Sequence, residues 1–265
     1  MRKLDKKPNI LVIGDLMIDH YLWGTCDRIS PEAPVQVVNV KKESSVLGGA
    51  GNVINNLFAL GANVDVISVV GDDLVANELK DLFDNINVSR NGLIVEKNRK
   101  TSKKSRLIAS QQQVLRYDME SIDDISSQSC DEILGKLKKD IKKYDSIILS
   151  DYGKGVLTSS LTKEIIKLAN ENKVKVLADP KGKDYSKYKG AYTLTPNKKE
   201  AIEATNIDIK DEESLIKALK SLQNTCELEL ALINLSEQGI AIFDDSLRIK
   251  PTVAREVYDV TGAGD

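Results

Sequence analysis

The last seven residues combine two glycines with two carboxylates in the string Asp259-Val260-Thr261-Gly262-Ala263-Gly264-Asp265. Glycines at this spacing let a backbone approach a ligand and turn its N–H groups inward, so that they form an anion-binding nest. If a helix follows, Asp265 lies where a carboxylate takes a proton from an attacking hydroxyl. The alternative interpretation is a glycine turn with an acidic helix cap. The string thus predicts either a phosphoryl-transfer site or a capped turn.

A second glycine cluster, Gly48-Gly49-Ala50-Gly51-Asn52, precedes an apolar helical segment. It does not match the dinucleotide-binding fingerprint GxGxxG, because Ile54 occupies the third glycine position. The chain also contains no GxxxxGKS or GxxxxGKT phosphate loop. A glycine-rich helix entry can present backbone groups and the Asn52 amide to the hydroxyls of a sugar. The alternative is a purely structural helix start.

The string Asn197-Lys198-Lys199-Glu200 follows Pro196 and a strand-like segment. An asparagine with a glutamate three residues later is close to a capping box. At the carboxyl edge of a sheet, Asn197 and Glu200 would also lie near nucleotide phosphates and Mg²⁺, which prefers oxygen ligands. The two roles are compatible, and both remain open.

Charged residues directly follow three predicted strands. Asp15, with Asp19 close behind, follows the first; Asp151-Tyr152-Gly153-Lys154-Gly155 and Asp179-Pro180-Lys181-Gly182 follow two others. Ligands of open α/β sheets bind at the carboxyl ends of the strands, so these residues predict a site there. Lys154 and Lys181 could hold phosphates in it, although a solvated surface lysine is the simpler interpretation of each alone.

Short apolar runs that end in polar or glycine-containing turns recur along the chain, and most lack strict alternation, as expected for strands covered on both faces. They lie at residues 9–14, 64–71, 146–150, 174–179, 192–195, 230–234 and 240–243. Segments with helical periodicity lie at residues 50–60, 74–83, 131–143, 158–171, 197–204 and 212–222. This order predicts an α/β domain with a mostly parallel central sheet.

Two segments do not fit that order. Residues 35–40 alternate in polarity, and residues 101–117 read as a polar two-stranded ribbon. Both are too polar for central strands, so we expect a small separate sheet beside the main one. It is either a surface hairpin or a lid over the active site.

Composition excludes several classes of protein. The 265 residues carry 38 Lys and Arg against 40 Asp and Glu, which argues against a dedicated nucleic-acid binder. Three cysteines without a CxxC pair give neither a disulfide framework nor a zinc site. The single histidine, His20, is expected to be structural or at most to face the substrate. No apolar stretch is long enough for a membrane span, so we expect a cytoplasmic protein without membrane partners.

Three strings, at residues 48–52, 197–200 and 259–265, follow one another along the chain in an order that resembles the ribokinase-like (PfkB-type) carbohydrate kinases. Four further strings resemble the D-glycero-β-D-manno-heptose-7-phosphate kinase branch: Asp15-Leu16-Met17-Ile18-Asp19, Arg28-Ile29-Ser30-Pro31-Glu32-Ala33-Pro34-Val35, Leu115-Arg116-Tyr117-Asp118 and Ser150-Asp151-Tyr152-Gly153-Lys154-Gly155. The resemblance covers essentially the whole chain.

The resemblance implies a ribokinase-like three-layer fold over residues 1–265, with lid segments at about 16–45 and 92–119 that often form a homodimer. It implies ATP- and Mg²⁺-dependent phosphorylation of the C1 hydroxyl of the heptose 7-phosphate, which supplies ADP-heptose for lipopolysaccharide core. Another sugar or nucleoside kinase, or a non-catalytic sugar- or nucleotide-binding regulator, is the alternative. The family domain continues past Asp265, often into an adenylyltransferase domain, so the chain is expected to be a C-terminally truncated kinase domain.

Roles follow by the same resemblance. Asp265 is the catalytic base, and Gly262, Ala263 and Gly264 form the anion hole. Thr261 and the four residues Asn197, Lys198, Lys199 and Glu200 lie on the ATP side, where Glu200 contacts Mg²⁺ indirectly. The remaining candidates are assigned to the sugar phosphate: Asp15, Asp19, Gly48, Gly49, Asn52, Arg116, Asp151, Lys154 and Lys181.

Overall fold

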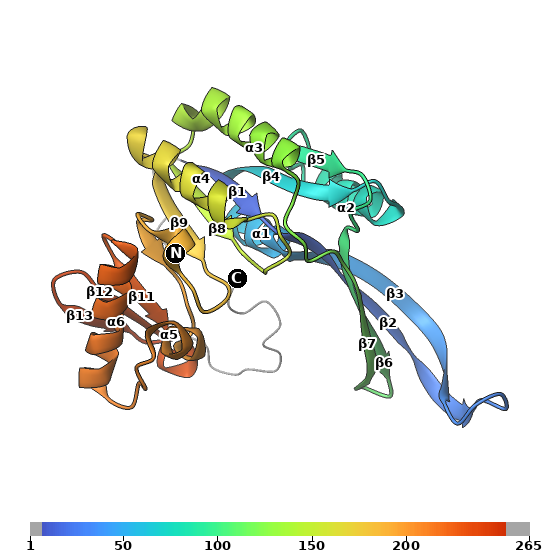
Figure 1. Cartoon of the computed structure of the whole chain (residues 1–265). Helices are drawn as coiled ribbons and strands as arrows, with labels where there is room; N and C mark the ends of the chain where they lie inside the picture. The colour runs from blue at the N-terminus through green and yellow to red at the C-terminus, as the bar shows by residue number, and fades with distance from the viewer. Residues whose placement is uncertain (1–6, 253–265) are drawn as a thin grey trace.

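A computed structural model describes residues 7–252, and its centre is a six-stranded parallel sheet (Figure 1). The strand order is β10-β9-β8-β1-β4-β5. The bounds are β1 Asn9–Gly14, β4 Asn63–Gly71, β5 Leu93–Glu96, β8 Ser146–Ser150, β9 Lys175–Asp179 and β10 Thr193–Leu194. All five pairings are parallel. The predicted α/β class with a mostly parallel sheet is therefore confirmed.

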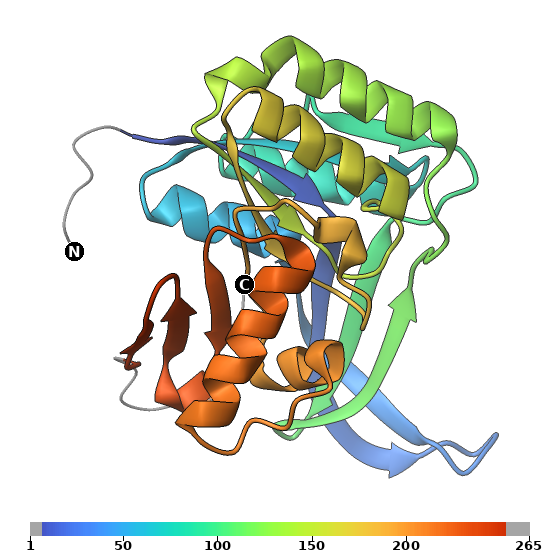
Figure 2. The same cartoon turned by 60° about the vertical axis from the view of Figure 1, so that its left-hand side comes forward.

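Helices cover both faces of this sheet, in three layers (Figure 2). Helices α1 (Ala50–Ala59) and α2 (Leu74–Asn85) pack with Val12 on one face. Helices α3 (Ser127–Asp140) and α4 (Ser159–Glu171) pack on the other face, with Leu11 and Ile13. Because successive side chains of β1 point to opposite faces, both layers require apolar residues there, which explains the continuous run in this strand.

The C-terminal part of the described chain forms a smaller unit beside β10. It contains α5 (Lys198–Thr205), α6 (Glu212–Cys226) and the antiparallel strands β11 (Ala231–Asn234), β12 (Ile240–Phe243) and β13 (Leu247–Lys250). Parallel bridges join residues 193 to 230 and 197 to 234, so β11 continues the edge of the central sheet. Three short 3₁₀ helices complete the described elements: η1 Ile141–Lys143, η2 Ser186–Tyr188 and η3 Ser236–Gln238.

The polar segments form a four-stranded sheet that projects away from the body (Figures 1 and 2), here called the lid sheet. Its order is β3-β2-β6-β7, with β2 Leu16–Ile29, β3 Gln36–Gly49, β6 Ser102–Ala109 and β7 Gln112–Met119. The ribbon expected at residues 101–117 is confirmed as β6 and β7. The strand expected at residues 35–40 is much longer. Strand β2 lies in the lid segment that the resemblance implies at about 16–45, but the residue pattern alone did not predict a strand there, because its charged residues break a regular alternation.

Within residues 7–252, no helix is both long and apolar enough to span a membrane.

Candidate active site

The loop at residues 151–157, which follows β8, is held by the side chain of Asp15. Asp15 is 1% exposed, and its carboxylate accepts hydrogen bonds from the backbone N–H groups of Tyr152 (2.8 Å), Lys154 (3.1 Å) and Val156 (3.1 Å). Burial raises the pKa of Asp15, and the three backbone hydrogen bonds oppose that rise. In the structure the buried Asp15 carboxylate supports this loop, and the sugar contact expected for Asp15 stays a prediction.

The same loop packs against the segment that leaves the lid sheet. Gly155 has a φ of 86°, and a Cβ there would lie 2.0 Å from the backbone oxygen of Asp123. The N–H of Ile125 donates to the backbone oxygen of Gly155 at 3.1 Å. Only glycine fits this position, so the loop and the chain after β7 are fixed together.

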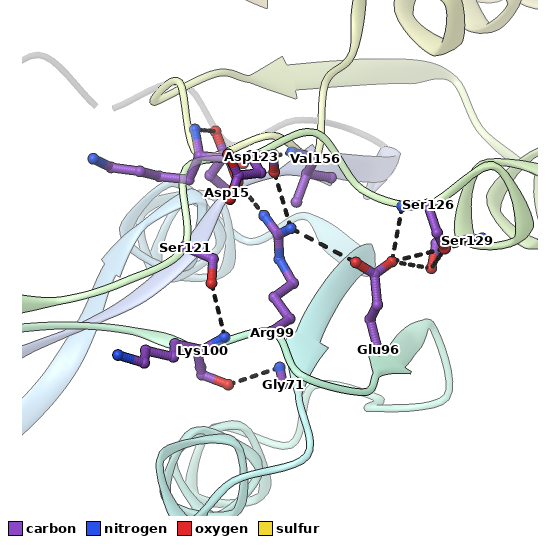
Figure 3. Close-up of polar contacts among 12 residues, drawn as sticks. Asp15, Gly71, Glu96, Arg99, Lys100, Ser121, Asp123, Ser126, Ser129 and Val156 are labelled. Carbon is purple, nitrogen blue, oxygen red and sulfur yellow. Dashed lines mark hydrogen bonds and ion pairs between the residues drawn. The ribbon is translucent and has the colours of Figure 1, made fainter.

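Arg99, at the entry to the lid sheet, connects three segments of the chain (Figure 3). Its side chain is 6% exposed and donates to the backbone oxygens of Asp123, at 3.1 Å, and Lys154. It also lies 3.8 Å from Oε1 of Glu96 at the end of β5. Sequence reasoning missed Arg99, because its partners are backbone carbonyls that no residue pattern reveals.

Glu96 links Arg99 to the start of α3 (Figure 3). One of its carboxylate oxygens accepts hydrogen bonds from the N–H and hydroxyl of Ser126 (both 3.0 Å) and from the hydroxyl of Ser129 (2.5 Å). Burial tends to raise the pKa of Glu96, but these hydrogen bonds and Arg99 lower it below the ordinary value. Ser126 is also the N-cap of α3. The base of the lid sheet is thereby joined to a helix of the body.

Asp19 and Arg106 form an ion pair on one face of the lid sheet, with 2.5 Å between Oδ1 and Nη1. Both side chains are 15% exposed. A Cβ at Gly48 would lie 2.2 Å from Oδ2 of Asp19, so this glycine makes room for the carboxylate. Gly49 (φ 57°) then turns the chain into α1, which carries the half-buried Asn52. The structure thus groups Asp19 with the predicted sugar-binding glycines.

Further charges lie on this same face, here called the lid face. Arg116 donates to both carboxylate oxygens of Asp118, at 2.9 and 2.7 Å. Lys154 reaches from the 151–157 loop to Glu120, with 2.6 Å between Nζ and Oε1. Arg116 and Lys154 therefore lie near Asp19, and their assignment to the substrate phosphate by the resemblance stays a prediction. Lys104 and Arg106 also lie there but were not selected from the sequence, although their alternate positions in a polar ribbon were a usable signal.

A separate pocket of about 180 Å³ opens at the carboxyl edge of the central sheet. It is lined by Asp151, Tyr152, Asp179, Pro180, Lys181, Thr195, Asn197, Glu200 and Asn234. Lys181 Nζ lies 3.4 Å from Oε1 of Glu200 in this pocket, so it is grouped with Glu200 rather than with Lys154 and Arg116. Lys198 and Lys199, from the first turn of α5, are not among the lining residues.

The capping box predicted at the start of α5 is present. The N–H of Glu200 donates to Oδ1 of Asn197 at 3.0 Å, and the N–H of Asn197 donates to Oε2 of Glu200 at 3.1 Å. Within residues 7–252, no group of three or more His, Cys, Asp and Glu side chains could hold a metal ion by itself. The oxygens of Asp179 and Glu200 fit an indirect role, because Mg²⁺ keeps several waters and is bound largely by substrate phosphates.

Asp151 lies between this pocket and the 151–157 loop and is 3% exposed. Its Oδ2 accepts from Lys187 Nζ at 2.5 Å and from the Tyr188 hydroxyl at 2.7 Å. Its Oδ1 accepts from the N–H of Gly153 at 2.8 Å. Burial and the nearby carboxylate of Asp151 raise the pKa of Tyr188, so this hydroxyl stays protonated and donates. Asp151 therefore positions the loop from its pocket side; sequence reasoning missed Lys187 and Tyr188.

His20 is buried in the lid sheet, where its ring nitrogens lie 2.9 Å from the Ser105 hydroxyl and 2.7 Å from Glu43. This agrees with the structural role expected for it. The predicted residues Thr261, Gly262, Ala263, Gly264 and Asp265 lie outside the residues that the structure describes.

Comparison with known proteins identifies a family. The protein-family model described as pfkB family carbohydrate kinase matches residues 7–265. The chain is 80% identical over 262 residues to the bifunctional protein HldE of Aliarcobacter butzleri, covering 99% of this chain and 55% of that protein. It is 60% identical to the HldE of Sulfurimonas denitrificans over 97% of this chain and 54% of that protein. The chain thus spans about half the length of the curated relatives it matches.

Solved structures share the fold at low sequence identity. Arabidopsis thaliana ribokinase, complexed with ribose and ATP, has a TM-score of 0.73 and 17% identity over 98% of this chain and 83% of its own. Escherichia coli phosphofructokinase-2, in complex with fructose-6-phosphate, has a TM-score of 0.71 and 17% identity over 97% of this chain and 83% of its own. The ribokinase-like architecture is therefore established.

Proposed function

The chain belongs to the pfkB family of carbohydrate kinases, and on that premise we propose that it phosphorylates D-glycero-β-D-manno-heptose 7-phosphate at the C1 hydroxyl, with ATP as the phosphoryl donor. The product is the 1,7-bisphosphate, which supplies ADP-heptose for lipopolysaccharide core. The HldE relatives support the heptose branch. These relatives are named bifunctional, and this chain spans about half of their length.

One observation carries the proposal: Asp19 lies beside the Gly48–Gly49 turn on a lid face that also holds cationic side chains. A carboxylate next to a glycine turn suits a sugar, because the carboxylate accepts hydrogen bonds from the sugar hydroxyls and the glycines let the backbone approach them closely. Arg116 and Lys154 supply positive charge beside it, which suits a phosphate on the same acceptor. Asn52, in the adjoining turn of α1, is a further ligand for the sugar.

ATP would occupy the pocket at the carboxyl edge of the sheet. Lys181 supplies positive charge there, while Asn197 and Glu200 are held rigid by their capping box. Mg²⁺, when bound with the nucleotide, neutralises charge on the phosphates during transfer. Glu200 and Asp179 would contact the waters of that ion. Thr261 is assigned to this side by resemblance to the family.

Chemistry at C1 requires a proton acceptor and donors for the transferring group. We assign Asp265 as the base, with the backbone N–H groups of Gly262, Ala263 and Gly264 as the anion hole, from resemblance to the family. Positioning and charge stabilisation carry most of phosphoryl transfer, which is consistent with a site built without histidine or cysteine.

The lid sheet is also proposed as the interface of a homodimer. Strand β7 is an edge of that sheet, and its face opposite the lid face exposes Leu115, Tyr117 and Met119. An exposed edge strand with an apolar stripe tends to pair with another chain. A second copy of this chain is the partner that fits it. ATP as donor favours the cytoplasm as the location.

An acceptor panel tests the proposal. Full-length protein is supplied with ATP, Mg²⁺ and one acceptor at a time: the heptose 7-phosphate, the unphosphorylated heptose, fructose 6-phosphate or ribose. ADP release and the phosphorus NMR spectrum of the product are measured. The proposal predicts the highest kcat/KM with the heptose 7-phosphate and a new phosphate signal from C1. A higher kcat/KM with fructose 6-phosphate or ribose would refute it.

A further inference from the structure

We propose, on the premise of the sugar-phosphate kinase function above, that Lys104 on β6 is a specificity-determining residue that binds the phosphate group of the acceptor. Lys154, from the 151–157 loop, is the second ligand of the same phosphate. The ligand class is a phosphomonoester. The charge of such a group at neutral pH, about −1.5 to −2, matches the two positive charges of Lys104 and Lys154.

Strand register places Lys104 at the centre of the lid face. It is paired with Asp19 across the β2–β6 ladder and with Asp118 across the β6–β7 ladder. Arg106, two residues further along β6, points to the same face and contacts Asp19 there. Lys104 therefore lies between the sugar-binding turn on one side and Arg116 on the other.

The charges of this cluster do not balance. The three cations nearest to Lys104 each have their own carboxylate: Arg106 with Asp19, Arg116 with Asp118, and Lys154 with Glu120. The side chain of Lys104 makes no hydrogen bond or ion pair with any residue in the described part of the chain. Of the four cations at residues 104, 106, 116 and 154, Lys104 alone has no carboxylate within ion-pair distance among the described residues, and it is half-buried.

The surroundings of Lys104 make its positive charge less favourable than it would be in water. Burial lowers its pKa, and the nearby cations Lys154 and Arg116 lower it further. The carboxylates of Glu120 and Asp118 oppose this only in part. An anion bound between Lys104 and Lys154 would relieve both the burial and the repulsion.

Without a bound phosphate, Lys154 forms an ion pair with Glu120. Oε1 of Glu120 accepts from Lys154 Nζ, whereas its Oε2 is buried and has no hydrogen-bond partner among the described residues. A phosphate that binds Lys154 must compete with this carboxylate. Removing the charge of Glu120 should therefore strengthen phosphate binding, in the opposite direction to removing Lys104.

Substitutions on the two faces of β6 provide a matched test. Lys104→Met removes the proposed ligand, and Lys103→Met makes the same change on the opposite face, where Lys103 pairs with Glu78 at 2.7 Å. The first readout is the ratio of kcat/KM for the heptose 7-phosphate to that for the unphosphorylated heptose. Lys104→Met should lower this ratio about 10- to 100-fold, the range expected for one charge-assisted hydrogen bond. Lys103→Met should leave it unchanged.

A second readout is independent of turnover: calorimetric binding of inorganic phosphate, together with thermal unfolding of each variant. Binding should weaken in Lys104→Met, strengthen in Glu120→Gln and stay unchanged in Lys103→Met. Wild-type binding in a folded Lys104→Met variant would overturn the inference. If no acceptor is phosphorylated but phosphate binding still depends on Lys104, the proposed function fails and the phosphate site stands.

Discussion

The backbone N–H of Lys154 lies 3.1 Å from Oδ2 of Asp15, so a residue at the end of β1 fixes the loop that follows β8. The Lys154 side chain extends from this fixed point to Glu120, just beyond the lid sheet. Arg99 binds the backbone oxygen of the same lysine. Lys154 is thus held by the central sheet and by the base of the lid sheet together, which gives a cation in the proposed acceptor site a defined position.

The first prediction concerns Asp15→Asn. An amide has one acceptor oxygen in place of two, so at least one N–H of the 151–157 loop loses its partner. We expect a stability loss of about 1–3 kcal/mol and a roughly tenfold rise in KM for the sugar phosphate. Asp145→Asn is the matched control, because Asp145 accepts from the N–H of Asn9 at the other end of β1. Equal KM values in the two variants would contradict the assigned role.

The second prediction concerns Arg99→Met, which leaves the backbone oxygens of Asp123 and Lys154 without this donor. We expect faster amide hydrogen exchange in residues 151–157 and in the segment after β7, and a KM for the acceptor raised more than kcat is lowered. Arg99→Lys should restore part of both effects, because it keeps one donor group. Loss of stability without faster exchange in these two segments would count against the coupling.

The third prediction is a pH dependence that arises from Glu96. Hydrogen bonds from Ser129 and Ser126 hold its pKa below 4.5 in the folded protein, despite an opposing effect of burial. A carboxyl group with a depressed folded-state pKa stabilises the protein above its unfolded-state pKa, and this contribution is lost as the pH falls through the folded-state pKa. Glu96→Gln should therefore cost about 1–3 kcal/mol at pH 7. The difference in the free energy of unfolding between wild type and Glu96→Gln should shrink below pH 4.5. Denaturant unfolding at several pH values measures this difference, and a difference that stays constant with pH would show that Glu96 is not responsible.

Local patterns predicted much of the fold. The apolar run at β1 and the capping box of Asn197 and Glu200 are both present, because each depends on neighbours in the sequence or on burial of both strand faces. The glycine entry to α1 was also recognised, although the reason for Gly48, its contact with Asp19, appears only in the structure.

Contacts set by strand pairing were not predictable. Asp19 and Arg106 are 87 residues apart and meet because β2 and β6 pair in parallel. In the sequence, Lys154 and Lys181 both follow a predicted strand, but the sequence does not reveal which strand ends face the lid sheet. Lys181, after β9, pairs with Glu200 in the other pocket.

The fourth prediction concerns the oligomeric state. Tyr117→Asp puts a charge in the exposed apolar stripe of β7, and we expect it to convert a homodimer into a monomer. Ile249→Asp places the same charge at an exposed apolar position on β13 and should leave the dimer intact. Sedimentation velocity distinguishes the two results. A monomeric wild-type protein, or a Tyr117→Asp dimer, would contradict the proposed interface.

The central claim is transfer of a phosphoryl group to C1 of heptose 7-phosphate with Asp265 as the base. The most direct measurement is the rate at which the 1,7-bisphosphate appears, followed by phosphorus NMR with ATP and Mg²⁺, in full-length wild-type protein and in Asp265→Asn. The wild type should form one C1 phosphate for each ADP that it releases. Asp265→Asn should lower the rate about 10²–10⁴-fold with ATP binding retained. ADP release without a C1 phosphate, or near-normal product formation by Asp265→Asn, would contradict the claim.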